Sequence, residues 1–242
     1  MHVYDEQTAT HYAAFRPPLH QLILDEALGR MRFQTGLDVG CGTGVSTLAL
    51  APYCEEVFGV DNSSAMLNQS HRHPKLTYRL GTAQDLPVES RSVDVVTMAG
   101  VLSYLDQQKL IDELERVCQP QAIVVPYDFK VDTNELLRRV GLPERPDPTH
   151  YDHACNLSWS SRMTVFARRT RRIELSMTAD QAAHVLLSNA HRYAALAKSH
   201  PQALLFENVR ESLSRSDWNG CVEVQIFYAV HGFHRYEKQL AQ

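Results

Sequence analysis

The chain has 242 residues and a net charge of −4, with 44% hydrophobic and 21% charged residues. This composition is typical of an ordinary globular protein, and the length suits one α/β domain with insertions. The negative charge argues against duplex nucleic acid as a partner, because such binding needs many cationic contacts to phosphates. We also expect no membrane partner, because no apolar run reaches the length of a membrane helix and no signal-peptide pattern follows Met1.

The five cysteines are scattered, and none lies in a C-x-x-C pair. An odd, unpaired set of thiols is typical of a reducing compartment, so we expect a cytoplasmic protein. The histidines include short-range pairs, but no cysteine or second ligand pair joins them at the usual zinc spacing. The sequence therefore predicts no metal site.

The first predicted element is a helix that follows Pro17-Pro18. Its apolar residues at positions 19, 22, 23, 27 and 28 fall on one face, and Gly29 stands where a helix stop is expected. We expect residues 1–30 to form a helical cover beside a sheet, with the segment before the helix able to fold over a ligand.

The chain is organised around a strand, a glycine turn and a helix start. An apolar run reaches Asp38, glycines follow at positions 40, 42 and 44, and residues 45–51 form a predicted helix. Glycine lacks a Cβ, so a ligand can lie almost against the backbone, and the helix start offers unpaired N–H groups. A dinucleotide fingerprint, G-x-G-x-x-G, would need glycine where Val45 stands. The spacing here is D-x-G-x-G-x-G, which predicts a different ligand.

Three further strands are predicted at Glu55–Val60, Leu76–Leu80 and Ser92–Thr97. Asp61 follows the second strand, and an acid at that tip can accept hydrogen bonds from both hydroxyls of a ribose. The segment after the third strand carries Asp85. In parallel sheets such strand ends meet at one edge, where ligands bind.

Taken in order, these segments resemble the motifs of the class I S-adenosylmethionine-dependent methyltransferases of the small-molecule type, from Gly36 to about Tyr127. The glycine turn resembles motif I, and residues 81–87 resemble the adenine-contacting segment. The resemblance implies S-adenosylmethionine as the cofactor and S-adenosylhomocysteine as its product. It also implies that the cofactor is contacted by Tyr12, Arg16, Asp38, Gly40, Cys41, Gly42, Gly44, Asp61, Asn62, Met66, Ala83, Gln84, Asp85 and Ala99.

The second half of the chain continues the alternation. A short fifth strand is predicted at Ala122–Val125, with Pro126-Tyr127-Asp128 just beyond its end, and further strands at Met163–Ser176 and Val222–His231. After the fourth strand a helix is predicted with Asp106 as its cap and with Leu110, Ile111, Leu114 and Val117 on one stripe. Further helices are predicted from residue 134, from a capping box of Thr178 and Gln181, and from Pro201. We therefore expect an α/β fold, a Rossmann-like, doubly wound, seven-stranded and mostly parallel sheet with a helical insertion after strand five. The resemblance implies an antiparallel last strand. Residues 1–242 would form one domain, with 132–215 as a lid on the substrate side.

Methyl transfer from a sulfonium is an in-line displacement, so the protein mainly has to align the reactants. A general base is needed only when the nucleophile carries a proton at neutral pH. The candidates for that role are His150, His153 and Tyr127, and a histidine is favoured because its ordinary pKa lies closest to neutral. The sequence leaves open whether oxygen, nitrogen or carbon is methylated. One departure from some relatives, Ser103-Tyr104 in place of His-Trp, leaves the acceptor open as well.

Four arginines at 168, 169, 171 and 172 form the densest basic cluster. They are explained either by a solvated edge strand or by an anionic substrate. We interpret the protein as a methyltransferase acting on a small organic acceptor, as a monomer or homodimer. The alternatives are a catalytically silent cofactor-binding subunit and an RNA methyltransferase that uses the arginine cluster.

Overall fold

The computed structural model describes residues 10–11, 14–15, 17–143, 151–198, 201–215 and 218–234. Its contacts divide the chain into two compact units. The sheet unit holds the described residues within 18–129, 151–171 and 226–234. The helical unit holds those within 1–17, 130–143 and 172–225, and three strands run from one unit into the other.

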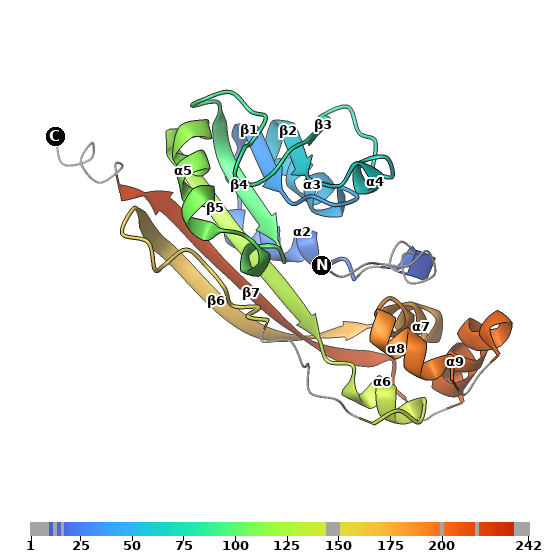
Figure 1. Ribbon diagram of the computed structural model, residues 1–242. Helices are drawn as coiled ribbons and strands as arrows, with labels where there is room; N and C mark the ends of the chain where they lie inside the picture. Colours follow the sequence, from blue (N-terminus) through green and yellow to red (C-terminus); the bar gives the residue numbers. More distant parts are fainter. Residues whose placement is uncertain are drawn as a thin grey trace. The chain divides into compact units, whose positions relative to one another are not determined.

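The described strands form one seven-stranded sheet in the order β3-β2-β1-β4-β5-β7-β6. Their bounds are Phe33–Val39 (β1), Cys54–Asp61 (β2), Leu76–Leu80 (β3), Val93–Ala99 (β4), Cys118–Val131 (β5), Met163–Ser176 (β6) and Cys221–Phe233 (β7). The pairings of β1 with β2 and β4, of β2 with β3, and of β4 with β5 are parallel. β7 runs opposite to β5 and β6 (Figure 1). This confirms the predicted fold class and its antiparallel last strand.

The helices of the sheet unit are α2 (Leu19–Leu28), α3 (Val45–Leu50), α4 (Ser64–Leu67) and α5 (Gln107–Val117), with short 3-10 turns at Ala51–Tyr53 and Leu102–Tyr104. The helical unit contains α6 (Asn134–Arg139), α7 (Ala179–Leu187), α8 (Ala190–Leu196) and α9 (Leu205–Ser214), with a 3-10 turn at Gln202–Leu204. Across the described ranges, every helix is too short or too polar to cross a bilayer.

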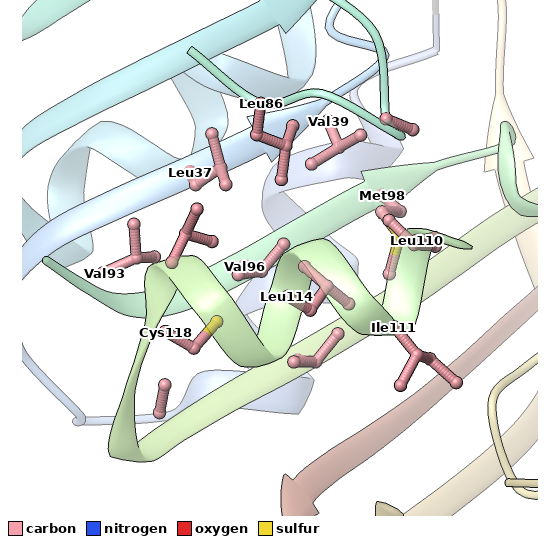
Figure 2. Close-up of a cluster of buried hydrophobic side chains, with 14 of the residues drawn as sticks. Leu37, Val39, Leu86, Val93, Val96, Met98, Leu110, Ile111, Leu114 and Cys118 are labelled. Carbon is pink, nitrogen blue, oxygen red and sulfur yellow. The ribbon is translucent and has the colours of Figure 1, made fainter. Parts of the chain in front are cut away.

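Helix α5 supplies the core on one face of the sheet. The Asp106 carboxylate caps it by accepting a hydrogen bond from the Lys109 N–H. Its apolar residues recur at i, i+1, i+4 and i+7, and all four are without exposed surface: Leu110, Ile111, Leu114 and Val117. They pack against side chains of β1 and β4 such as Leu37 and Val96 (Figure 2). Each buried side chain of this size stabilises the fold by about 1.5–3 kcal/mol, which fixes α5 on the sheet.

Helix α2 covers the opposite face of β5. His20 of α2 contacts the Tyr127 ring, whereas Val124 belongs to the α5 core. Positions 124 and 127 point to opposite faces, because side chains alternate along a strand. The predicted helix is confirmed, but its stripe is wrong at Leu22, which is 37% exposed, while Leu24 is fully buried.

Two predicted boundaries are wrong. The fifth strand extends over Cys118–Val131 rather than stopping at Val125, so Tyr127 and Asp128 lie within it and not beyond its end. Pairing with β4 as far as Ala99↔Tyr127 explains the extension. The last predicted helix begins at Leu205, because residues 202–204 form a 3-10 turn after Pro201.

In the helical unit, the sequence pattern that predicted the start of α7 is confirmed. The predicted capping box is present, since the Thr178 hydroxyl accepts from the Gln181 N–H and the Gln181 side chain accepts from the Thr178 N–H. Helices α7 and α9 pack together. Most of the predicted insertion at 132–215 falls in this unit, and its role as a lid, like that of residues 1–30, stays a prediction.

Candidate functional site

The parallel strands of the sheet unit end at one edge, and the predicted ligand residues follow them there. Asp38 pairs with Thr97, and Ala99 pairs with Tyr127. The Gly40 N–H donates to the Val60 carbonyl, which places the glycine turn beside the end of β2. The glycine turn, Asp61, Ala99 and Tyr127 thus belong to the same edge, as the sequence predicts.

The three glycines of the turn all have positive φ angles, 73° at Gly40, 53° at Gly42 and 81° at Gly44. A Cβ on Gly40 would lie 2.7 Å from the Val101 side chain, and one on Gly44 would collide with the Tyr78 hydroxyl. A Cβ on Gly42 would meet nothing within 4 Å. Two glycines therefore admit the protein's own side chains, and only Gly42 leaves open space for a ligand.

Asp38 is fully buried, and its carboxylate faces hydroxyl groups. Oδ2 accepts from Ser46 Oγ at 2.6 Å and Thr47 Oγ1 at 2.8 Å, and Oδ1 accepts from Thr97 Oγ1 at 3.0 Å. Burial raises the pKa of this carboxyl to about 6, although the three hydroxyls act in the opposite direction. The contacts tie β1 to α3 and β4. Asp38 therefore fixes the shape of the turn, and its predicted cofactor contact stays a prediction.

Asp61 is half-buried beside the turn. Its Oδ2 accepts from the Gly42 N–H at 2.8 Å and its Oδ1 from the Ser63 N–H at 2.9 Å. A carboxylate can accept about four hydrogen bonds, so each oxygen keeps capacity for a ribose hydroxyl. Of the neighbouring predicted contacts, Asn62 is exposed and Met66 is half-buried.

The predicted adenine-contacting segment has a buried anchor and an exposed tip. Ala83 is buried, while Gln84 and Asp85 are exposed. Helix α5 holds the segment, because the Arg116 guanidinium donates to the Leu86 carbonyl at 2.7 Å. The two polar side chains are thus held on a fixed loop near the ends of β2 and β3.

Two further predicted contacts are at the edge, and three predicted residues cannot be placed. Cys41 is buried, and burial raises the pKa of its thiol, so it is no nucleophile at neutral pH. Ala99 is half-buried at the end of β4. Tyr12, Arg16 and His150 lie outside the described residues.

His153 meets an acidic partner beside the end of β4. Its Nδ1 lies 2.7 Å from Asp128 Oδ2 on β5. The Tyr151 hydroxyl donates to the Gly100 carbonyl at 2.8 Å, which fixes the loop to the residue that follows β4. A carboxylate at Nδ1 orients the imidazole and leaves Nε2 as the proton-accepting nitrogen. Of the three predicted catalytic candidates, His153 has the geometry of a base.

Tyr127 is 4% exposed, and its hydroxyl lies 2.9 Å from His20 Nδ1. Burial, followed by the negative charges of Asp38 and Asp128, raises the pKa of its phenol well above the ordinary value. The phenol therefore stays protonated at neutral pH. This environment favours a positioning role over proton abstraction.

A small pocket of the sheet unit opens beside these groups. It is lined by basic, aromatic and polar residues that include Pro126, Tyr127, His153, Asn156, Arg168 and Phe227. The sequence could have marked Arg168 through its cluster. Nothing local marks Asn156 or Phe227, which reach the pocket from distant parts of the chain.

The histidines show no metal centre in the described ranges, where no three His, Cys, Asp or Glu residues are arranged so that they could hold a metal ion. His231 is the exceptional histidine. Its side chain is fully buried on β7, and neither ring nitrogen has a hydrogen-bond partner among the described residues.

Similarity to known proteins is concentrated in the region of this site. The family model described as a methyltransferase domain matches residues 37–125. A ubiquinone/menaquinone biosynthesis C-methyltransferase from Campylobacter jejuni is 33% identical over 101 residues, covering 38% of this chain and 43% of that protein. A demethylmenaquinone methyltransferase from Clavibacter sepedonicus is 29% identical over 139 residues, covering 55% and 57%. The chain spans about half the length of these curated relatives.

Solved structures share the fold over most of the chain. A proposed type II methyltransferase from Anaeromyxobacter dehalogenans has a TM-score of 0.63 at 23% identity, covering 90% of this chain and 98% of that one. A proposed methyltransferase from Bacillus halodurans has a TM-score of 0.54 at 14% identity, covering 88% and 97%. At these identities the likeness shows the fold alone.

Proposed function

We propose, on the premise that this chain belongs to the class I S-adenosylmethionine-dependent methyltransferases, that it methylates a small organic acceptor carrying an acidic hydroxyl group. The observation that carries the proposal is the edge of the sheet. There, open space at Gly42 lies beside the half-satisfied Asp61 carboxylate, and the His153–Asp128 pair follows the end of β4.

The residues present suit the cofactor. Asp61 would accept hydrogen bonds from the ribose hydroxyls with its remaining lone pairs, and Gly42 would admit the ligand against the backbone. Asp85 would accept from the adenine amine. When bound, S-adenosylmethionine supplies an electrophilic methyl group on a good leaving group. The edge then has to hold the acceptor in line, which can contribute up to ~7–11 kcal/mol.

His153 would take the proton of the acceptor hydroxyl at Nε2. Asp128 holds the opposite ring nitrogen and stabilises the imidazolium that forms. General-base action of this kind typically contributes a factor of about 10²–10⁴. A phenolate or enolate formed in this way can be methylated on oxygen or on the adjacent carbon. The relative from Campylobacter jejuni is a C-methyltransferase by name, and C-methylation is compatible with the same base.

The test separates cofactor binding from catalysis. Calorimetry should show that S-adenosylhomocysteine binds and that a nicotinamide dinucleotide does not. Tighter binding of the dinucleotide would overturn the proposal. With an acceptor in hand, His153→Gln and Asp128→Asn should lower turnover and keep the affinity for S-adenosylhomocysteine. Wild-type turnover in both variants would mean that alignment alone carries catalysis. Cofactor binding with no turnover on any hydroxyl acceptor would favour the silent-subunit alternative.

A further inference from the structure

The four arginines of β6 differ in whether an acid neutralises them. Arg171 pairs with Glu26 at 2.6 Å, and Arg172 lies 3.5 Å from Glu223. In the described part of the chain, Arg168 has no acidic partner, and the Arg169 guanidinium donates only to the Arg168 carbonyl, at 3.0 Å. The two arginines without acids, 168 and 169, are the two that line the small pocket. The positive charge of these two arginines is therefore not neutralised by an acid and lies beside the pocket.

Arg168 and Arg169 act on opposite faces of the sheet. Successive side chains of a strand alternate between faces. Arg171 pairs with Glu26 of α2, and Arg169 lies two positions from Arg171, so both face α2, whereas Arg168 faces away from α2. His20 of α2 contacts Tyr127, so the next residue, Asp128, also faces away from α2, and it holds the His153 ring that stacks on Phe227. Arg168 is therefore the arginine on the face of Phe227.

That face also carries the candidate base. The His153 ring stacks on Phe227 with centroids 5.8 Å apart and an interplanar angle of 15°. The Tyr151 ring meets His153 edge-on at 4.7 Å. The imidazole of His153, the ring of Phe227 and Arg168, which has no acidic partner among the described residues, thus line one pocket, and Tyr151 packs against His153. This combination suits a planar molecule that carries both a negative group and a hydroxyl.

We propose that the pocket selects an anionic acceptor, with the Arg168 guanidinium binding its carboxylate or phosphate while His153 faces its hydroxyl. The inference rests on the proposed function for the identity of the reaction. Arginine suits this role because its planar fork of donors matches both oxyanions. Arg169 also borders the pocket, but its side chain lies on the face of α2, away from His153 and Phe227, so it serves as the matched control.

In the experiment, three probes of similar size are titrated into the full chain loaded with S-adenosylhomocysteine, and ligand-observed NMR measures their binding. The probes are benzoate, phenyl phosphate and the neutral benzyl alcohol. At least one anion should bind the wild type about tenfold or more tightly than benzyl alcohol, because charged hydrogen bonds are stronger than neutral ones. Which anion binds more tightly identifies the oxyanion.

Arg168→Gln should abolish that preference, and Arg169→Gln should keep it. Arg168→Lys, which retains the charge without the fork, should fall between them. Equal affinity for anions and benzyl alcohol in the wild type, or equal losses in the two glutamine variants, would overturn the inference. If S-adenosylhomocysteine does not bind, the proposed function fails, and the same titrations without it still decide the anion preference.

Discussion

The packing around His231 on β7 can be tested through the pH dependence of the protein's stability. Its imidazole is fully buried, and neither nitrogen finds a partner in the part of the chain that the structure describes. Burial, and secondarily the positive charge of Arg168, lowers its pKa from 6.5 to about 4. The ring is therefore neutral in the folded protein at neutral pH, and it gains a proton more readily when the chain unfolds.

The sign of the effect follows from that difference. A group whose folded pKa is depressed from 6.5 to about 4 contributes full stability above the unfolded value, and the contribution is lost as pH falls. When the pH falls from about 7.5 to about 5, the titration of His231 should lower the free energy of unfolding by ~2 kcal/mol.

Asp38 acts in the opposite direction. Its folded pKa is raised from 3.8 to about 6, so its contribution is present at low pH and is lost as pH rises through about 6. Over the same interval, from about pH 7.5 down to about pH 5, it should add ~1.4 kcal/mol. In the wild-type protein the two groups thus nearly compensate each other.

His231→Leu removes one side of this balance. The variant should be at least as stable as the wild type near neutral pH, because two unpaired buried polar atoms are removed. On acidification to about pH 5, its stability relative to wild type should rise by ~2 kcal/mol. Urea denaturation followed by tryptophan fluorescence measures both quantities. His71→Gln at an exposed histidine is the control. Parallel pH curves for His231→Leu and wild type would refute the reasoning.

Asp61→Ala should weaken S-adenosylhomocysteine binding by ~1.5–3 kcal/mol by calorimetry, because it removes a charged acceptor; an unchanged affinity would contradict the ribose role. Thr97→Val leaves Asp38 with two hydroxyl donors instead of three and should cost about 1–3 kcal/mol in urea denaturation. A fully stable variant would show that this hydrogen bond is dispensable. Gly44→Ala should destabilise the fold more than Gly42→Ala, which should act mainly on cofactor binding. Equal stabilities would refute that division.

The sheet was predictable because each of its signals is local. Apolar runs marked the strands, and the period of Leu110, Ile111, Leu114 and Val117 marked α5. Asp106 and Thr178 could be recognised as helix caps in the sequence, because a capping side chain accepts a hydrogen bond from a backbone N–H only three residues further on. The resemblance to the class I methyltransferases rested on several such signals in one order, with Asp61 at the predicted strand tip.

The candidate active site was less predictable because it depends on pairs distant in sequence. His153 and Asp128 are 25 positions apart, and only the extension of β5 through Asp128 brings the carboxylate to the imidazole. Phe227 arrives from β7 to stack on the same ring. No periodicity or turn residue marks such contacts, so the sequence could name His153 without its partners.

In the structure, most of the glycine motif has a different role from the one that its spacing suggested. Its alternating glycines suggested a ligand at each position, yet Gly40 makes room for Val101 and Gly44 for Tyr78. The carboxylate of Asp38, which begins the motif, accepts hydrogen bonds from three hydroxyl groups of the protein itself. Most of the motif is therefore required by the fold of the turn itself. A chain could keep these residues and lose the cofactor, so the open space at Gly42 is stronger evidence for a ligand than the full motif.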